Sequence, residues 1–339
     1  MAEKELFKVD AIDRKLLMEL NREVRAPLAQ LARRIRSSKE VTRYRLLRLE
    51  RAGVIKQYAT IFGMGYWAYK TVLRFQRIDA RQEERIIKEL AAHPRTNFLT
   101  QCSGDWDAVV ALMAKDPADL NEVLDDVRRI VGDALGDLQS AVSVGGHTYG
   151  HTYLLPHVRE APAAKRRSDI AIDDIDRAIC REIRQDARRK LTDIASSTGV
   201  PAETVRNRIR RLQERGIIKR YRLILDSSRV GFQRYEIFVR GTPLTRTARA
   251  AFIAFGQEHP AIEYLGSYVG AWDFTITAHV RTPEEFRALL QELRAKLGAH
   301  IRDMTSVTLF STLNYTYLPD ELLDSAVSGS SRSHARGRS

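Results

Sequence analysis

The chain repeats itself at a spacing of 163 residues, and this internal repeat constrains the fold more than any other feature. The segment Leu28–Tyr58 begins LAQLA and ends RLERAGVIKQY, and the segment Leu191–Tyr221 begins LTDIA and ends RLQERGIIKRY. Self-similarity at a fixed period indicates that one structural unit is present more than once. A chain of 339 residues also has room for several domains. The sequence therefore predicts a duplicated architecture.

A first helix is predicted at the beginning of each copy. Apolar residues recur there at spacings of three and four, which places them on one face of an amphipathic helix. They are Val9, Ile12, Leu16 and Leu20 in the first copy and Ile172, Ile175, Ile179 and Ile183 in the second. Cys180 matches Leu17, so we expect it to be a small core residue rather than a reactive thiol.

Two further helices and a strand are predicted in each copy. The second helix starts near Leu28 or Leu191, and the third at Ser38-Lys39 or Pro201-Ala202. Gly53 and Gly216 are placed to end the third helix, as glycine does at a helix C-terminus. The runs 54–62 and 217–225 have the β-branched and aromatic content of strands. Three helices followed by a short β-hairpin predict a winged helix-turn-helix.

Each winged module is followed by signals in the order strand, helix, strand, strand, helix, strand. The expected elements are 66–78, 80–92, 97–103, 106–114 and 117–131 in the first copy and 232–241, 246–257, 262–269, 272–280 and 283–297 in the second, each followed by a last strand region. A tight Gly-x-Trp-Asp turn joins the two central strands. This order is the split βαβ arrangement of a ferredoxin-like domain. We therefore predict an α+β fold with two copies of a winged helix-turn-helix plus a ferredoxin-like βαββαβ domain.

The predicted boundaries divide the chain into six parts. Residues 1–62 and 170–226 form the two winged modules, and residues 63–156 and 227–320 form the two ferredoxin-like domains. Residues 157–169 contain Pro162, alanines and a basic cluster, which is typical of an exposed linker. Residues 321–339 are rich in Ser, Gly and Arg, and we expect a disordered basic tail.

The overall charge and the cysteine content narrow the class of protein. A net charge of +13 favours a polyanionic partner. Two cysteines are too few for a disulfide framework or a metal knuckle. We find no signal-peptide pattern and no segment long enough to span a bilayer, so we expect a cytoplasmic protein without a membrane partner.

The ordered set of motifs resembles the Lrp/AsnC (feast/famine) family of transcriptional regulators. The second copy carries Ile175-Asp176, Leu191-x-x-Ile194-Ala195, Val205-x-x-Arg208-Ile209-x-x-Leu212 and Gly216-Ile217-Ile218. The first copy carries Ile12-Asp13-x-x-Leu16-Leu17, Leu28-x-x-Leu31-Ala32, Arg45-Leu46-x-x-Leu49-Glu50 and Gly53-Val54-Ile55. The first copy departs from the pattern where Arg36 replaces Gly199 and Thr42 replaces Val205. The resemblance implies DNA binding by the winged modules, and assembly and sensing of an effector, often an amino acid, by the ferredoxin-like domains.

The outward face of each third helix carries the predicted contacts to double-stranded DNA. They are Lys39, Arg43, Tyr44 and Arg48 in the first copy and Thr204, Arg206, Asn207, Arg210 and Arg211 in the second. Arginine can bind guanine or phosphate, and asparagine can bind adenine through two hydrogen bonds. Tyr44 replaces Asn207, so the first copy is poorer in hydrogen-bonding groups and we expect one chain to recognise an asymmetric site. The alternative is that these are solvated faces of ordinary surface helices.

The Gly-x-Trp-Asp turns are the predicted effector site, because the resemblance places effectors near this turn at a subunit interface. The residues are Gly104, Asp105, Trp106, Asp107, Gly270, Trp272 and Asp273. Asp107 and Asp273 are the first choices for binding an ammonium group, and the alternative is a structural role in accepting hydrogen bonds from turn amides. Tethering favours internal pairing of the two domains, although a homo-oligomer joined through sheet edges is equally compatible.

No catalytic residue, cofactor or metal site is predicted. His147 and His151 would share one face of a strand, but no matching carboxylate or cysteine spacing accompanies them. Twin proteins of this fold also resemble sirohaem decarboxylases, in which a histidine or tyrosine acts on a tetrapyrrole. His147, Tyr149, His151 and Tyr153 would serve that alternative, which the basic third helices and the retained turns argue against. A third hypothesis is a regulator that acts only through protein partners.

Overall fold

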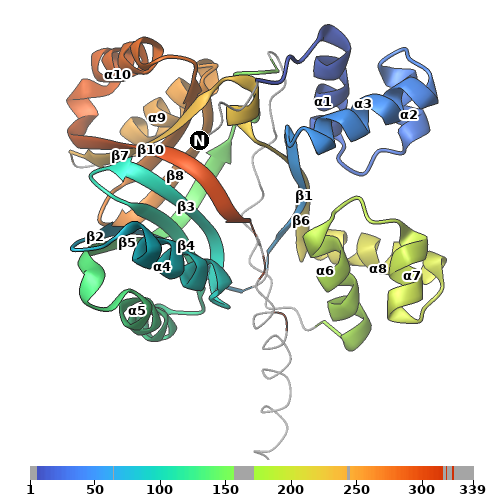
Figure 1. Cartoon of the computed structure of the whole chain (residues 1–339), viewed down its shortest axis with the longest axis horizontal. Helices are drawn as coiled ribbons and strands as arrows, with labels where there is room; N and C mark the ends of the chain where they lie inside the picture. Colours follow the sequence, from blue (N-terminus) through green and yellow to red (C-terminus); the bar gives the residue numbers. More distant parts are fainter. Residues whose placement is uncertain are drawn as a thin grey trace, which may run out of the picture.

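The computed structural model describes residues 6–63, 65–155, 172–242 and 245–315, together with Leu318 and Leu323. The predicted linker 157–169 lies outside the described residues, and so does the predicted tail 321–339 apart from Leu323. A pair of helical modules stands beside an eight-stranded barrel (Figure 1). No helix in the described ranges combines the length and the apolar content needed to cross a membrane.

The two helical modules contain the predicted elements in the predicted order. Module one has α1 (Ala11–Arg22), α2 (Leu28–Arg34), α3 (Lys39–Arg51) and β1 (Ile55–Phe62). Module two has α6 (Asp174–Gln185), α7 (Leu191–Thr198), α8 (Ala202–Glu214) and β6 (Ile218–Leu225). Ser38 caps α3 by accepting a hydrogen bond from the amide of Val41, and Pro201 precedes α8. Cys180 is fully buried in the core of module two, which confirms its expected role.

The turn between the second and third helices contains a left-handed residue at the same position in both modules. Gly199 has a left-handed backbone with φ of 71°, and Arg36 takes the same conformation with φ of 56°. Thr42 is fully buried, and its Oγ1 donates a hydrogen bond to the carbonyl of Ser38 at 2.7 Å. The hydroxyl that replaces the Val205 methyl is therefore satisfied within the helix. The two departures of the first copy leave its turn intact.

The local hairpin that we expected in each module is wrong. Strand β1 instead pairs antiparallel with β6 of the other module, because the chain leaves β1 through Gly63 and passes directly to a strand of the barrel. The register opposes Ile55 to Leu225 and Phe62 to Ile218, so the two ends of the pair exchange under an approximate two-fold rotation. The strand pair therefore joins two equivalent modules into an internal pseudo-dimer.

Two arginines strengthen this pairing with reciprocal contacts. The guanidinium of Arg25 donates to the carbonyl of Ala187, and that of Arg188 donates to the carbonyl of Val24. Arg25 lies over the ring of Tyr221 at 5.5 Å, and Arg188 lies over the ring of Tyr58 at 5.3 Å. Each module thus places one arginine in the other by the same set of contacts.

The barrel contains both predicted ferredoxin-like domains. The first comprises β2 (Trp67–Phe75), α4 (Ala80–Ala92), β3 (Thr96–Gly104), β4 (Ala108–Ala114), α5 (Pro117–Val131) and β5 (Leu135–Thr148). The second comprises β7 (Gln233–Gly241), α9 (Arg246–Glu258), β8 (Ile262–Gly270), β9 (Phe274–Val280), α10 (Pro283–Leu297) and β10 (Ile301–Tyr315). Short 3-10 turns occupy Gly132–Ala134, Ser227–Val230 and Gly298–His300.

The two four-stranded sheets close on each other at both edges. The strand orders are β5-β2-β4-β3 and β10-β7-β9-β8, and the pairs β3–β10 and β5–β8 complete the barrel. Closure removes the exposed sheet edges that would otherwise attract another chain. The expected internal pairing of the two domains is therefore present, with α4, α5, α9 and α10 packed outside the sheets (Figure 1).

The chain segments that follow the barrel strands return to the helical modules. Leu154 and Leu155 lie in the core of module one, and Leu318 and Leu323 lie in the core of module two. Leu323 was predicted to belong to the tail, but it is fully buried and belongs to module two. Each module is thus attached to the barrel through its β-strand and through these returning leucines.

Candidate nucleic-acid interface and effector cavity

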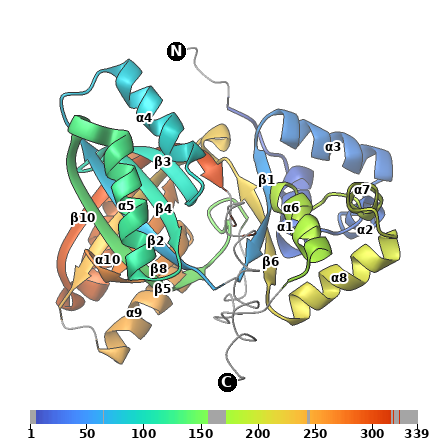
Figure 2. The ribbon, with the colours of Figure 1, turned by 90° about the horizontal axis from the view of Figure 1, so that it is seen from below.

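The third helices α3 and α8 expose the faces on which the DNA contacts were predicted. Leu49 in α3 and Val205, Ile209 and Leu212 in α8 are buried against their modules. On the opposite faces the structure exposes Lys39, Arg43, Tyr44, Arg206, Asn207, Arg210 and Arg211, whereas Arg48 and Thr204 are half-buried. The two helices lie on opposite flanks of the module pair (Figure 2). The arrangement leaves both faces open to a partner.

The exposed residues of the two third helices differ in chemistry. Tyr44 is 67% exposed and Val41 is 43% exposed, so α3 presents two large, mostly apolar groups to solvent. In α8 the guanidinium of Arg210 donates to Oδ1 of Asn207 at 2.6 Å, and Arg206 pairs with Glu203. The second module therefore offers an ordered polar surface, and the first offers a smaller set of hydrogen-bonding groups.

Two of the predicted DNA contacts are also engaged inside their own module. Arg48 binds the fully buried carboxylate of Asp13, and Arg211 binds the equally buried Asp176 at 2.9 Å. These ion pairs tie the third helix of each module to its first helix. Sequence reasoning missed this role, and a contact of Arg48 or Arg211 with DNA stays a prediction.

A second arginine in each module completes this ion cluster. Arg45 donates to Asp10 at 2.6 Å, and Arg208 donates to Asp173 at 2.6 Å. A hydrogen bond from the amide of Asp13, together with Arg45, holds the pKa of Asp10 below its ordinary value. All four members of the cluster recur 163 residues later, and this repetition was the signal available in the sequence.

The two Gly-x-Trp-Asp turns follow β3 and β8, as predicted, but their final aspartates, Asp107 and Asp273, do not line the cavity between the turns. Oδ2 of Asp107 accepts a hydrogen bond from the amide of Phe75 at 2.7 Å, and Oδ2 of Asp273 accepts one from Gly241 at 2.8 Å. Both carboxylates therefore bind the ends of neighbouring strands rather than turn amides. This geometry supports the structural alternative for Asp107 and Asp273.

The glycines of the turns are required by the backbone. Gly104 and Gly270 have φ of 129° and 137°, in a region that side chains rarely occupy. A Cβ on Gly270 would lie 2.8 Å from the carbonyl oxygen of Ser140, and one on Gly104 would lie 3.0 Å from that of Ser306. The predicted glycines thus allow the turn of each domain to approach a strand at close range.

The structure gathers the other predicted effector residues around one cavity of about 200 Å³ at the seam between the two domains. Asp105, Trp106 and Trp272 line it, together with Arg74, Arg240 and Asp303. Arg74 donates to the carbonyl of Asp105 at 2.9 Å, and Arg240 donates to that of Ala271 at 2.6 Å. Two guanidinium groups and two carboxylates therefore border the same cavity.

The histidines and tyrosines considered for catalysis contact different parts of the fold. Strand β5 ends at Thr148, so the prediction that His147 and His151 share a strand face is wrong. His151 is buried and bonded to the carbonyl of Leu223, and the hydroxyl of Tyr149 donates to the carbonyl of Ile253. Among the described residues no cluster of three or more potential ligands could hold a metal ion.

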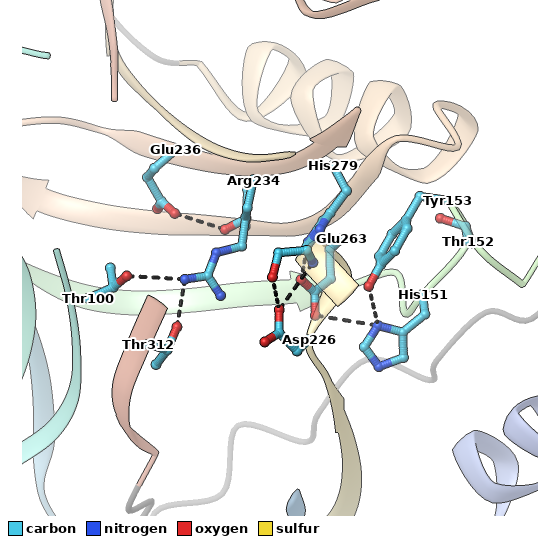
Figure 3. A network of polar contacts seen from close by, with 12 residues as sticks. Thr100, His151, Thr152, Tyr153, Asp226, Arg234, Glu236, Glu263, His279 and Thr312 are labelled. Atoms are coloured by element: carbon cyan, nitrogen blue, oxygen red, sulfur yellow. Dashed lines mark hydrogen bonds and ion pairs between the residues drawn. The ribbon is translucent and has the colours of Figure 1, made fainter. Parts of the chain in front are cut away.

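A buried polar network extends from this region into the barrel (Figure 3). Glu263 forms an ion pair with Arg222 and a hydrogen bond with His279, whose Nε2 lies 2.6 Å from Oε2 of Glu263. Burial alone would raise the pKa of Glu263, but the charge of Arg222 and the hydrogen bond from His279 hold it far below its ordinary value. Arg222 and Glu263 border a barrel cavity of about 180 Å³.

Comparison with known proteins agrees with the two-module architecture. A model described as winged helix-turn-helix DNA-binding matches residues 9–56, and the AsnC-type helix-turn-helix domain matches residues 172–213. HTH-type transcriptional regulator LrpA of Mycobacterium tuberculosis is 29% identical over 139 residues, 41% of this chain and 91% of the relative. HTH-type transcriptional regulator FL11 of Pyrococcus horikoshii is 27% identical, over 37% of this chain and 83% of its own.

One solved structure is similar over nearly the whole chain. The sirohaem decarboxylase NirDL aligns over 94% of this chain and 99% of its own, with a TM-score of 0.59 and 12% identity. At this identity the likeness concerns the fold alone. The fold and the two exposed third helices define a tandem helix-turn-helix protein. One helix-turn-helix module matches the winged helix-turn-helix model and the other matches the AsnC-type model, and the chain is similar to the HTH-type transcriptional regulator LrpA over 41% of its length.

Proposed function

We propose that this chain is a sequence-specific transcriptional regulator that binds duplex DNA through α3 and α8. The observation that carries the proposal is the exposure of Arg43, Arg206 and Arg210 on helices whose apolar faces are buried. A helix held in this way can enter the major groove, with its outward residues at base edges and phosphates.

Both modules sit in one pseudo-dimer, so one chain presents two unlike helices to its target. Arg206, Asn207 and Arg210 offer hydrogen bonds to purines, whereas Tyr44 and Val41 offer mainly apolar contact. This difference supports an asymmetric binding site for a single chain. Two chains paired about a two-fold axis would still present a symmetric array.

The salt dependence of DNA binding tests the proposal. Each phosphate contact contributes a slope of about −0.9 to the dependence of log K on log salt. We expect Arg206→Ala combined with Arg210→Ala to weaken binding at least tenfold and to make the slope shallower. The control combines Arg128→Ala with Arg129→Ala on the exposed face of α5, which removes the same charge from the barrel side. Equal binding by the two double variants contradicts the proposal.

The cavity between the Gly-x-Trp-Asp turns is the proposed effector site. Its guanidinium groups suit a carboxylate, and Asp105 and Asp303 suit an ammonium group, so the lining matches an amino acid zwitterion. Asp105 takes over the ammonium-binding role first assigned to Asp107 and Asp273. A thermal-shift screen over amino acids, repeated with Asp105→Asn, tests this assignment. If amino acids raise the melting temperature of Asp105→Asn as much as that of the unmodified chain, Asp105 does not bind the ammonium group.

Relatives named as transcriptional regulators favour a non-enzymatic function. The competing hypothesis is a tetrapyrrole-binding enzyme with the fold of NirDL, and binding of a tetrapyrrole tests it. An ultraviolet–visible titration with an iron tetrapyrrole should leave the absorption bands of the ligand unchanged. A saturable band shift at one ligand per chain supports a tetrapyrrole-binding protein instead.

A further inference from the structure

A separate cavity of about 320 Å³ lies in the second ferredoxin-like domain, on the side that faces module one. Its lining includes Tyr153, Phe232, His259, Ala261, Glu285 and Glu292. None of these residues borders the cavity between the Gly-x-Trp-Asp turns. The volume falls within the range typical of small-molecule sites.

In the first ferredoxin-like domain an arginine occupies the corresponding position. The guanidinium of Arg95 lies 3.3 Å from the carboxylate of Asp119, and both side chains are largely buried. Oδ2 of Asp119 also accepts a hydrogen bond from the amide of Lys115 at 2.7 Å. His93 pairs with Asp126 at 3.3 Å on the same helix pair. The first domain therefore fills this place with its own cation.

The second domain keeps the acceptors but lacks the cation. At an offset of 166 residues, Arg95 becomes Ala261 and Asp119 becomes Glu285. Oε2 of Glu285 accepts the amide of Arg281 at 2.7 Å, as Asp119 accepts that of Lys115. His259 lies 3.5 Å from Glu292, as His93 lies beside Asp126. Glu285 is exposed and forms no ion pair with any described residue, so its carboxylate is accessible to a ligand in the cavity.

A buried histidine adds an acceptor to the cavity wall. His279 lines the cavity and is 3% exposed, and its Nε2 is engaged with Glu263. Its Nδ1 has no hydrogen-bond partner in the described part of the chain. Burial lowers the pKa of His279, which favours the neutral ring with a free lone pair on Nδ1. A donor group inside the cavity would satisfy this atom.

Aromatic groups complete the wall, and the nearby cations are occupied. Tyr153 stacks on His279 with ring centroids 4.1 Å apart, and flat π surfaces attract cations. Lys296 is bound to Glu292 at 2.8 Å. Arg281 lies over the Phe232 ring at 4.1 Å and donates to the carbonyl of Val230. The local chemistry thus favours a positively charged guest.

We infer that this cavity binds a small guanidinium-bearing molecule, whose planar head takes the position that Arg95 fills in the first domain. A guanidinium matches a carboxylate through two parallel hydrogen bonds, which an ammonium group does not. Tyr153 and Phe232 also pack against the core of module one, so the ligand touches the contact between that module and the barrel. The site is independent of the proposed DNA and effector functions.

Calorimetric titration of the full chain with n-propylguanidine tests the inference. This probe is the arginine side chain without its amino acid group, so a zwitterion site does not select it. We expect saturable binding at one molecule per chain. Ala261→Arg should abolish it by inserting the guanidinium of the first domain, and Glu285→Gln should weaken it at least tenfold.

Glu284→Gln is the matched control, because it removes the same charge one residue away and outside the cavity lining. It should bind n-propylguanidine as the unmodified chain does. If Ala261→Arg fails to fold, the pair Glu285→Gln and Glu284→Gln decides the question. Absence of binding to the unmodified chain, or equal affinities for these two variants, overturns the inference whether or not the chain binds DNA.

Discussion

The two halves of the chain share a framework but differ in the residues on the outward faces of their third helices. Asp13 with Arg48 and Asp176 with Arg211 form the same ion pair in each module. At equivalent outward positions, however, Tyr44 of α3 corresponds to Asn207 of α8, and Leu47 corresponds to Arg210. Matching ion pairs therefore tie the third helix to the first in both modules, while the exposed residues of the two third helices differ.

The barrel shows the same kind of divergence in its interior. The second copy contains the ion pair of Glu263 with Arg222 and the hydrogen bond of Glu263 with His279. Ala59, Asn97 and Met113 occupy the corresponding positions of the first copy. A buried charge network therefore stabilises one half of a barrel whose other half is held at this place by smaller and less polar groups.

Removal of the central acid of this network is expected to have the largest effect. Glu263→Ala leaves Arg222 buried without its main partner, so we expect the free energy of unfolding to fall by about 3–5 kcal/mol. Asn97→Ala is the matched change in the first copy and should lower the free energy of unfolding by no more than about 1 kcal/mol, because it removes an acceptor, Oδ1 of Asn97, that has no partner among the described residues. Urea unfolding measures both. Similar losses of unfolding free energy in Glu263→Ala and Asn97→Ala would contradict the proposed difference between the halves.

Substitutions on the third helices should separate the two modules by their sequence preference. Asn207→Ala removes a side chain able to bind adenine through two hydrogen bonds, worth about 1–3 kcal/mol of discrimination. We expect the ratio of Kd values for a scrambled and a selected duplex to fall by about tenfold. Tyr44→Ala should change this ratio less, and the reverse order counts against asymmetric recognition.

The turns between the second and third helices should give the smallest effect, with opposite signs in the two modules. Gly199→Ala forces a side chain into a left-handed backbone and should lower stability by about 1 kcal/mol. Arg36→Gly relieves the same conformation and should raise stability by up to about 1 kcal/mol. Thermal unfolding shows whether each variant gains or loses stability. A loss in both variants would show that contacts of Arg36 with its surroundings stabilise its left-handed conformation.

Local features of the fold were predictable from the sequence, because helix periodicity and end signals act over a few residues. The bounds of α4, α5 and α10 agree with their predicted ranges. Strand signals do not specify a partner, so the pairing of β1 with β6 and the closure of the barrel did not follow from them. The exposed faces of α3 and α8 followed from the apolar spacing of these helices.

The detailed roles of charged residues were less predictable. Asp107 was assigned to an ammonium group, yet its acceptor oxygen meets the amide of Phe75, 32 residues away in the chain. Arg48 lies on the outward side of α3, but its buried partner Asp13 belongs to another helix. Such contacts depend on how separate elements pack against each other. The spacing of residues within one helix or strand contains no information about this packing.

The antiparallel seam between β1 and β6 joins parts of one polypeptide. Dilution therefore does not separate the paired modules, and the geometry between α3 and α8 is set when the chain folds rather than when two subunits meet. A mutation in the gene also changes only one of the two helices. One half of a target site can consequently evolve a new base preference while the other half keeps its own.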